Sequence, residues 1–143
     1  MTEVQKIVVG IDGSESSLQA LRWALSEARL RKASVEVIHT WNVTPIVDPM
    51  GTGMFIPVDD LVAAGNGVIA NAMKLVEDLV KDTKVTMKVV QGAASFTLLE
   101  ASKTADLIVV GRRGHGGFIG LLIGSVAQQV AHHASCPSVI VPV

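Results

Sequence analysis

Short runs of β-branched residues constrain the fold of this chain more than any other feature. Residues 6–10 read KIVVG and residues 106–111 read DLIVVG, so their apolar residues are consecutive rather than alternating with polar ones. Such runs are typical of strands covered on both faces, which occur in parallel sheets sandwiched between helices. Residues 34–41, SVEVIHTW, and the final PSVIVPV are predicted to be further strands of the same sheet.

Segments with helical periodicity alternate with these strands. From Leu18 to Ala28 the apolar residues recur at helical spacing, and Ser14 or Ser16 is available as the N-cap. The remaining predicted elements are helices at 61–80, 95–105 and 124–134, a strand at 84–90, and a loop with no assigned role from Asn42 to Gly67. Strands and helices alternating in this way predict an α/β fold, an open doubly wound five-stranded parallel sheet with helices on both faces. One domain is expected, spanning residues 1–143.

The composition excludes several classes of partner. A formal net charge of -1 gives no basic surface for nucleic acid or for a membrane. With 49% hydrophobic and 17% charged residues, the chain is expected to cover part of its apolar surface by self-association. The single Cys136 cannot form an intramolecular disulfide, and the chain opens with no secretory pattern, so a cytoplasmic location is predicted.

A glycine-rich stretch follows the 106–111 strand. It contains six glycines between Gly111 and Gly124, together with Arg112 and Arg113, and leads into a predicted helix at Ser125. A helix N-terminus offers unpaired N–H groups, and glycine lets the backbone approach an anion closely. Because open parallel sheets bind ligands beyond the carboxyl ends of their strands, this pattern favours phosphate binding over a merely flexible, solvated loop.

Two familiar phosphate motifs are missing from this stretch. The chain has no Gly-x-x-x-x-Gly-Lys-Ser/Thr, and Ile119 stands where the pattern Gly-x-Gly-x-x-Gly needs its last glycine. A P-loop NTPase and a dinucleotide-binding Rossmann enzyme are therefore not supported.

The spacing of the glycines does match another signature. Gly111-x-x-Gly114, nine residues, and then Gly124-Ser125 resembles the nucleotide-binding motif of the ATP-binding subgroup of the universal stress protein family. The resemblance extends over nearly the whole chain except about residues 42–67. It implies the sheet order 3-2-1-4-5, a homodimer built on the last strand, and ATP, with Mg²⁺, bound beyond the first and fourth strands.

The same resemblance implies roles for individual residues. Ile11 and the backbone of Thr40 would border the adenine, and Asp12 would lie near the ribose and a phosphate-bound Mg²⁺. Arg112, Arg113 and His115 are added from their charge alone. The complete predicted site is Ile11, Asp12, Thr40, Gly111, Arg112, Arg113, Gly114, His115, Gly116, Gly117, Gly124, Ser125 and Val126.

The last strand is expected to pair with a second copy of the chain. Its apolar residues Val139, Ile140, Val141 and Val143 would otherwise leave an exposed, aggregation-prone edge. With no nucleophile or general base evident beside the glycine stretch, no catalytic residue is assigned.

The preferred function is a dimeric, ATP-binding, nucleotide-dependent regulator of a stress response. A slow Mg-dependent ATPase or phosphotransferase, with Asp12 holding the metal, is the first alternative. A nucleotide-independent dimeric interaction module is the second. The four histidines lack metal-ligand spacing and are interpreted as structural.

Overall fold

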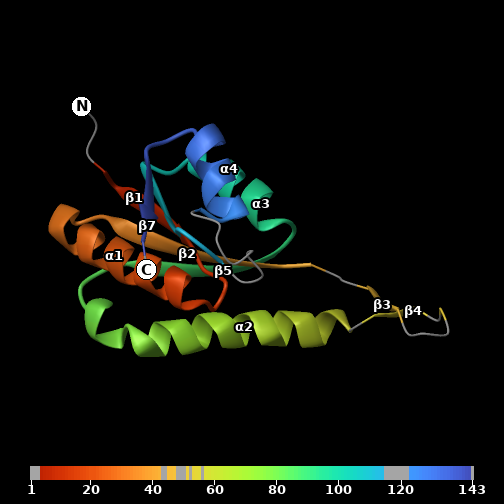
Figure 1. The fold of residues 1–143 in the computed structure, drawn as a ribbon. Coiled ribbons are helices and arrows are strands. Elements are labelled where there is room, and N and C mark those ends of the chain that lie inside the picture. Colours follow the sequence, from red (N-terminus) through yellow and green to blue (C-terminus); the bar gives the residue numbers. More distant parts are fainter. Residues whose placement is uncertain are drawn as a thin grey trace.

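The computed structural model describes residues 4–42, 45–47, 51, 53–55, 57–114 and 123–142 of the 143-residue chain. Strands and helices alternate along most of it, as the sequence predicts (Figure 1). The elements are β1 (Lys6–Gly10), α1 (Glu15–Arg31), β2 (Ser34–Trp41), β3 (Pro45–Val47), β4 (Gly53–Phe55), α2 (Val58–Leu75), the 3-10 helix η1 (Glu77–Leu79), β5 (Val85–Gln91), α3 (Ala94–Ser102), β6 (Leu107–Gly111), α4 (Ser125–His133) and β7 (Ser138–Val141).

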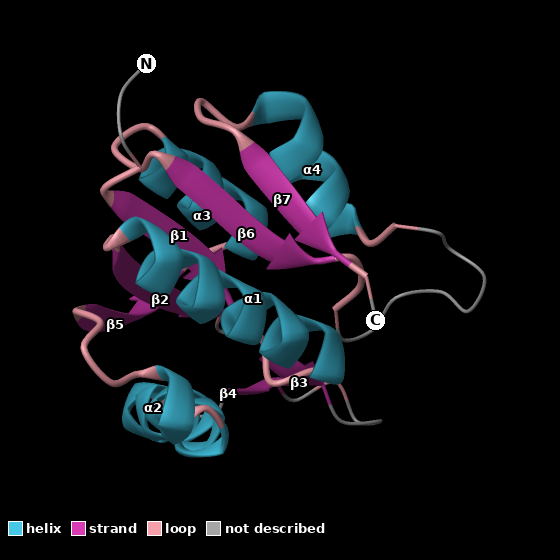
Figure 2. Ribbon diagram, turned by 90° about the vertical axis from the view of Figure 1, so that its left-hand side faces the viewer, coloured by secondary structure: helices cyan, strands magenta, loops and turns pink. Residues whose placement is uncertain are grey.

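Five parallel strands form the central sheet in the order β5-β2-β1-β6-β7. Numbered among these five strands alone, this is the predicted order 3-2-1-4-5, and the predicted fold class is confirmed. Helices α1 and α2 cover one face of the sheet, while α3 and α4 cover the other (Figure 2). The chain moves outward in one direction from β1 to β2 and in the other from β1 to β6, so the strand order reverses between β1 and β6.

Each face of the sheet has its own apolar cluster. On the α1 and α2 side, Val9 and Val37 pack against the fully buried Leu21 and Leu25 of α1. On the α3 and α4 side, a second cluster includes Val8, Ile38 and Ile108 of the strands together with helix residues. Burying one such side chain contributes about 1.5–3 kcal/mol, so the two clusters together fix the sandwich.

Helix α1 begins at one of the two predicted caps. The Ser14 side chain accepts a hydrogen bond from the backbone N–H of Ser17 at 3.2 Å, which makes Ser14 the N-cap. The helix ends at Arg31, and the left-handed φ of 55° at Lys32 turns the chain so that the N–H of Ala33 donates to the carbonyl of Ala28 at 2.9 Å. Ser16 is buried instead, and it contacts the loop that follows β6.

The segment predicted as a loop from Asn42 to Gly67 is more regular than expected. It contains the antiparallel pair β3–β4, which stands apart from the three layers in Figure 1, and α2 begins at Val58 rather than at residue 61. The helix also ends at Leu75 and is followed by η1, where a single helix to Val80 was predicted.

The expectation that every strand is covered on both faces is wrong for β5. Thr86, Met87 and Lys88 are exposed, because β5 is at one edge of the sheet. The side chain of Met87 lies on the same side of the sheet as α2, as those of Val85 and Val89 do, yet 54% of Met87 is exposed to solvent.

No helix of the described residues is long and apolar enough to cross a membrane.

Candidate functional site

A cavity of about 310 Å³ lies where the carboxyl ends of β1 and β6 meet, at the point where the strand order reverses. This volume is near the lower end of the range of roughly 300–1,000 Å³ typical of small-molecule sites. The lining residues come from the turn after β1, the end of β2, the start of α3, the loop after β6 and the first turn of α4. They are Gly10, Ile11, Asp12, Ser17, Ile38, Thr40, Ala94, Leu98, Val110, Gly111, Arg112, Arg113, Gly114, Gly124, Ser125, Val126 and Ala127.

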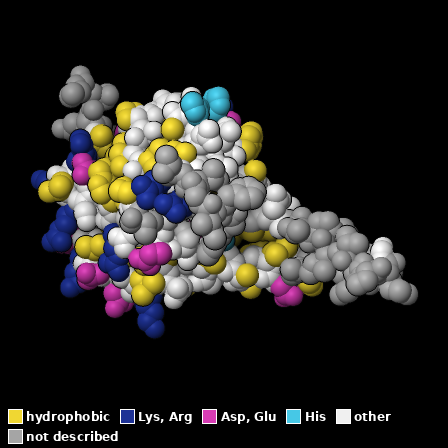
Figure 3. Space-filling view, viewed as in Figure 1, with side chains coloured by type: hydrophobic (Ala, Val, Ile, Leu, Met, Phe, Trp, Pro, Cys, Tyr) yellow, Lys and Arg dark blue, Asp and Glu magenta, His cyan; other side chains and the backbone are white. Residues whose placement is uncertain are grey.

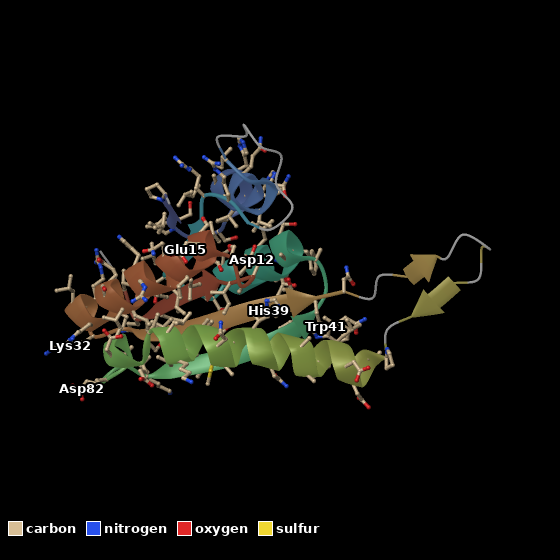
Figure 4. All side chains as sticks on the ribbon, turned by 60° about the horizontal axis from the view of Figure 1, so that its bottom comes forward. Asp12, Glu15, Lys32, His39, Trp41 and Asp82 are labelled. Carbon is tan, nitrogen blue, oxygen red and sulfur yellow. The ribbon has the colours of Figure 1, made fainter. Side chains whose placement is uncertain are left out.

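The turn from β1 into α1 forms the first wall. The backbone N–H of Asp12 donates to the Ser17 hydroxyl at 3.2 Å, and a carboxylate oxygen of Asp12 accepts the N–H of Ser14 at 2.9 Å. Gly13, between them, has a φ of 85°, a conformation that glycine adopts without strain. These bonds place the Asp12 carboxylate at the start of α1 (Figure 4).

The loop after β6 forms the second wall and is held against the first helix. The Arg113 N–H donates to the Ser16 hydroxyl at 3.2 Å, while the Arg112 N–H donates to the carbonyl of Val141 at 2.9 Å. A Cβ at Gly111 would lie only 2.6 Å from the carbonyl oxygen of Ser16, so only glycine allows this close approach. Glycine at position 111 thus has a packing role.

The first turn of α4 closes the cavity. Gly124 is the N-cap residue, makes no side-chain cap, and donates its own N–H to the carbonyl of Arg112 at 2.6 Å. The next three residues, Ser125, Val126 and Ala127, have no partner within the helix for their N–H groups, because a helix begins with unpaired donors. All three line the cavity. Unpaired donors and the positive end of the helix dipole make this wall suitable for an anion.

Arg112 adds a charge to the same region. Its Nε atom is buried and has no hydrogen-bond partner among the residues that the structure describes. An unpaired buried guanidinium nitrogen is costly, and an anionic ligand would satisfy it.

Other lining residues of the cavity are apolar. Ile38, Val110 and Ala127 contribute side chains from two strands and from α4, and Leu98 of α3 lies beside them. A Cβ at Gly10 would come within 2.7 Å of a methyl carbon of Leu98, so the glycine at the end of β1 makes room for this side chain. The cavity therefore combines donors suited to an anion with an apolar surface suited to a flat or apolar group.

A shallower groove lies on the opposite side of the β1–α1 turn. It has a volume of about 520 Å³ and runs between α1 and α2, where Glu15 and Asn71 are among its lining residues. Ile11, Asp12 and Ser17 line both hollows. The turn is consequently a partition with open space on each side.

Ten of the thirteen predicted site residues line the cavity together: Ile11, Asp12, Thr40, Gly111, Arg112, Arg113, Gly114, Gly124, Ser125 and Val126. His115, Gly116 and Gly117 lie outside the described residues. No group of three or more His, Cys, Asp or Glu side chains suited to a metal ion occurs within the described part of the chain. Any Mg²⁺ here would therefore need oxygen ligands from the bound molecule, which is how Mg²⁺ commonly binds beside phosphates.

The sequence analysis missed seven lining residues, namely Gly10, Ser17, Ile38, Ala94, Leu98, Val110 and Ala127. Gly10, Ile38 and Val110 lie at strand ends, and that position was a usable signal. The sequence around Ala94 and Leu98 carried no such signal, because only the packing of α3 on the sheet brings these two residues to the cavity.

On one face of the molecule (Figure 3), the charged side chains of the described residues form no patch of a single sign. On the face seen in Figure 3, basic and acidic side chains are interspersed, and no broad region carries one sign. This mixture agrees with the low net charge of the chain.

Comparisons with known proteins agree with this architecture. A model of the universal stress protein family matches residues 3–142. A universal stress protein of Mycobacterium tuberculosis is 37% identical over 143 residues, which cover 94% of this chain and 46% of that protein. The chain spans about half the length of the first curated relatives it matches.

Two solved structures are also similar. A universal stress protein from Lactobacillus plantarum superposes with a TM-score of 0.79 at 20% identity, covering 99% of each chain. A universal stress protein in complex with cAMP superposes with a TM-score of 0.71 at 29% identity, covering 98% of each chain.

Proposed function

This chain belongs to the universal stress protein family, and we propose that it binds an adenine nucleotide, with ATP and Mg²⁺ as the preferred ligand, in the cavity between β1 and β6. The observation that carries the proposal is that one cavity combines two kinds of lining. Unpaired helix N–H groups and Arg112 line it together with the apolar residues Ile38, Leu98 and Val110. A nucleotide likewise combines charged phosphates with a flat base.

Each wall then has a role. Ser125 and Val126 offer backbone N–H groups, and Ser125 also a hydroxyl, to phosphate oxygens. Ile11 and Thr40 border the base. The Asp12 carboxylate would hold Mg²⁺ together with the phosphates, where the ion would neutralise phosphate charge. The similar protein solved with cAMP supports an adenine nucleotide as the class of ligand.

The proposed regulator is a homodimer. β7 is an edge strand, paired only with β6 among the strands that the structure describes. Val139 and Ile140 are only partly buried there, and Val143 lies outside the described residues. A second copy of the chain would cover this edge. Sedimentation at micromolar concentration should give twice the chain mass of 15.0 kDa, and a monomer would contradict the dimer.

Calorimetric titration of Mg-ATP into nucleotide-stripped protein tests the site. We expect binding in the micromolar range for the wild type and none for Gly124→Val, because a Cβ at 124 lies 3.3 Å from the carbonyl oxygen of Arg112 and a branched side chain would block the approach of phosphate. Gly67→Val is the control, since a Cβ at Gly67 meets nothing within 4 Å. Unchanged affinity in Gly124→Val would contradict the assignment.

The same preparation separates the alternatives. Multiple turnover of ATP that disappears in Asp12→Ala would favour the ATPase or phosphotransferase. Absence of binding to the wild type would favour the nucleotide-independent dimer. The nucleotide-dependent regulator instead predicts micromolar binding of ATP with little turnover.

A further inference from the structure

His39 is hydrogen-bonded to the backbone of the site. Its Nδ1 lies 2.9 Å from the carbonyl oxygen of Ile11, 28 positions earlier in the chain. A carbonyl oxygen can only accept a hydrogen bond, so Nδ1 must carry the hydrogen and donate it. Figure 4 shows His39 on β2, beneath the turn that carries Asp12.

The place of His39 on β2 explains why its ring is fixed. Val35 and Val37 are in the cluster on the α1 and α2 side, and the alternation of a strand puts His39 on that same side. There α2 passes close by, since a Cβ at Gly65 would lie 3.3 Å from Cδ2 of the His39 ring. The glycine leaves room for the imidazole between helix and sheet.

The bonded carbonyl belongs to the turn that separates the cavity from the groove between α1 and α2, since Ile11 and Asp12 line both. The Ile11 side chain is buried in the cluster on the α1 and α2 side. Hydrogen bonds hold the backbone of the turn. The N–H of Ile11 donates to the carbonyl of Ile38 at 2.9 Å, and the N–H of Asp12 donates to the Ser17 hydroxyl at 3.2 Å. His39 supplies the side-chain donor for the Ile11 carbonyl.

We propose that His39 is a positioning residue of the nucleotide site: its Nδ1–H holds the carbonyl of Ile11, and with it the turn that presents Ile11 and Asp12 to the ligand. This inference rests on the proposed function. The sequence analysis interpreted His39 as a structural residue, and a role in positioning the site goes beyond that interpretation. His39 does not line the cavity, so it acts through Ile11 and does not touch the ligand.

The test compares two replacements of the histidine by titration with Mg-ATP. In His39→Asn the side-chain amide nitrogen occupies nearly the position of Nδ1 and can donate to Ile11. In His39→Leu the donor is lost while an apolar group remains in the core. We expect wild-type affinity for the asparagine variant and roughly tenfold weaker binding for the leucine variant, the size of one net hydrogen bond.

Val89→Ala is the matched control. Val89 packs against the cluster on the α1 and α2 side and faces Gly65 beside His39, but its aliphatic side chain cannot donate a hydrogen bond to the turn. It should lower the thermal midpoint without lowering nucleotide affinity. Equal affinity of His39→Leu and the wild type, or equal weakness of the asparagine and leucine variants, would overturn the role of the hydrogen bond.

A measurement without nucleotide separates this inference from the proposed function. In the ligand-free protein, the backbone amide signals of Asp12 and Ser14 should shift in His39→Leu and stay near wild type in His39→Asn. Amide signals that do not respond to His39→Leu overturn the inference even if the wild type binds ATP. A wild type that binds no nucleotide overturns the proposed function, while the amide shifts still report whether His39 holds the turn.

Discussion

Gly114 and Asp12 belong to the two facing walls of the cavity and meet so closely that a Cβ at position 114 would lie 2.5 Å from a carboxylate oxygen of Asp12. The two residues are about a hundred positions apart in the chain. Asp12 follows β1 and Gly114 follows β6, the two strands between which the strand order reverses. The second glycine of the Gly-x-x-Gly pair therefore leaves room for the acidic side chain opposite it in its present position, apart from any contact with a ligand.

Gly114→Ala should weaken nucleotide binding with little effect on stability. The added methyl group cannot coexist with the present position of the Asp12 carboxylate, so either the loop or the carboxylate must move. We expect at least a tenfold loss of affinity for Mg-ATP, equivalent to roughly 1.4 kcal/mol. Titration calorimetry measures it, with Gly67→Ala as the control that meets no neighbouring atom. Wild-type affinity in Gly114→Ala would show that the contact is unimportant for binding.

Ser14→Ala should destabilise the fold through the start of α1. The Ser14 hydroxyl accepts the N–H of Ser17, and loss of an N-cap of this kind costs about 1 kcal/mol. Urea unfolding of the alanine variant, beside Ser14→Asn, measures the effect, since asparagine is also an effective N-cap. If the asparagine variant loses as much stability as the alanine variant, the cap bond is not the cause.

Local sequence patterns predicted the parts of this fold in which one segment determines its own structure. The run IVV of β1 and the periodic leucines of α1 need no distant partner to be interpreted, and β1, β2, β6 and β7 were all predicted close to their observed positions. The choice between Ser14 and Ser16 as N-cap was not decidable, because both precede the same periodic segment. Only the loop after β6, far away in the sequence, gives Ser16 its own partner.

Helix α2 shows the opposite case, in which contacts with other elements matter. It begins at Val58 although the sequence predicted a start at residue 61, and it contains Gly65 and Gly67, each of which disfavours a helix by about 1 kcal/mol relative to alanine. Packing explains why position 65 is a glycine despite this cost, because a Cβ there would lie 2.7 Å from a methyl carbon of Val89 on β5. The glycine motif likewise predicted the loop after β6 and the start of α4 as parts of the site. The place of Leu98 in the cavity and the hydrogen bond of His39 depend instead on contacts between elements that no short motif contains.

The lysine pair on Glu36 should show a non-additive effect on stability. Glu36 is 7% exposed, and its two carboxylate oxygens lie 3.3 Å from Nζ of Lys6 and 3.5 Å from Nζ of Lys88. The Lys88 side chain is 58% exposed, so Lys88→Met alone should cost less than about 1 kcal/mol. Removing both lysines leaves a buried carboxylate unpaired and should cost about 3 kcal/mol.

A double-mutant cycle in urea gives the coupling between the two lysines. Glu36→Gln in the Lys6→Met, Lys88→Met double variant is the control, because it removes the unpaired charge and should recover much of the lost stability. Costs of Lys6→Met and Lys88→Met that simply add would mean that each lysine interacts with Glu36 independently.

Cys136 should react slowly with thiol reagents near neutral pH. Burial, and secondarily the charge of Asp106, raises the pKa of the Cys136 thiol above its ordinary value. The folded state therefore favours the neutral thiol, and less of the reactive thiolate is present than in an unfolded chain at the same pH. At pH 8 the native protein should react with a disulfide reagent more slowly than the urea-unfolded protein.

The sign of this shift also fixes the pH dependence of stability. Because the folded pKa is the higher one, the contribution of Cys136 is fully present below the pKa of the unfolded thiol and is lost as the pH rises through the folded pKa. Cys136→Ala should flatten the alkaline limb of the stability curve. Asp106→Asn should speed the thiol reaction, while its side-chain oxygen can still accept the N–H groups of Gln5 and Lys6. A native thiol that reacts as fast as the unfolded one would contradict the raised pKa.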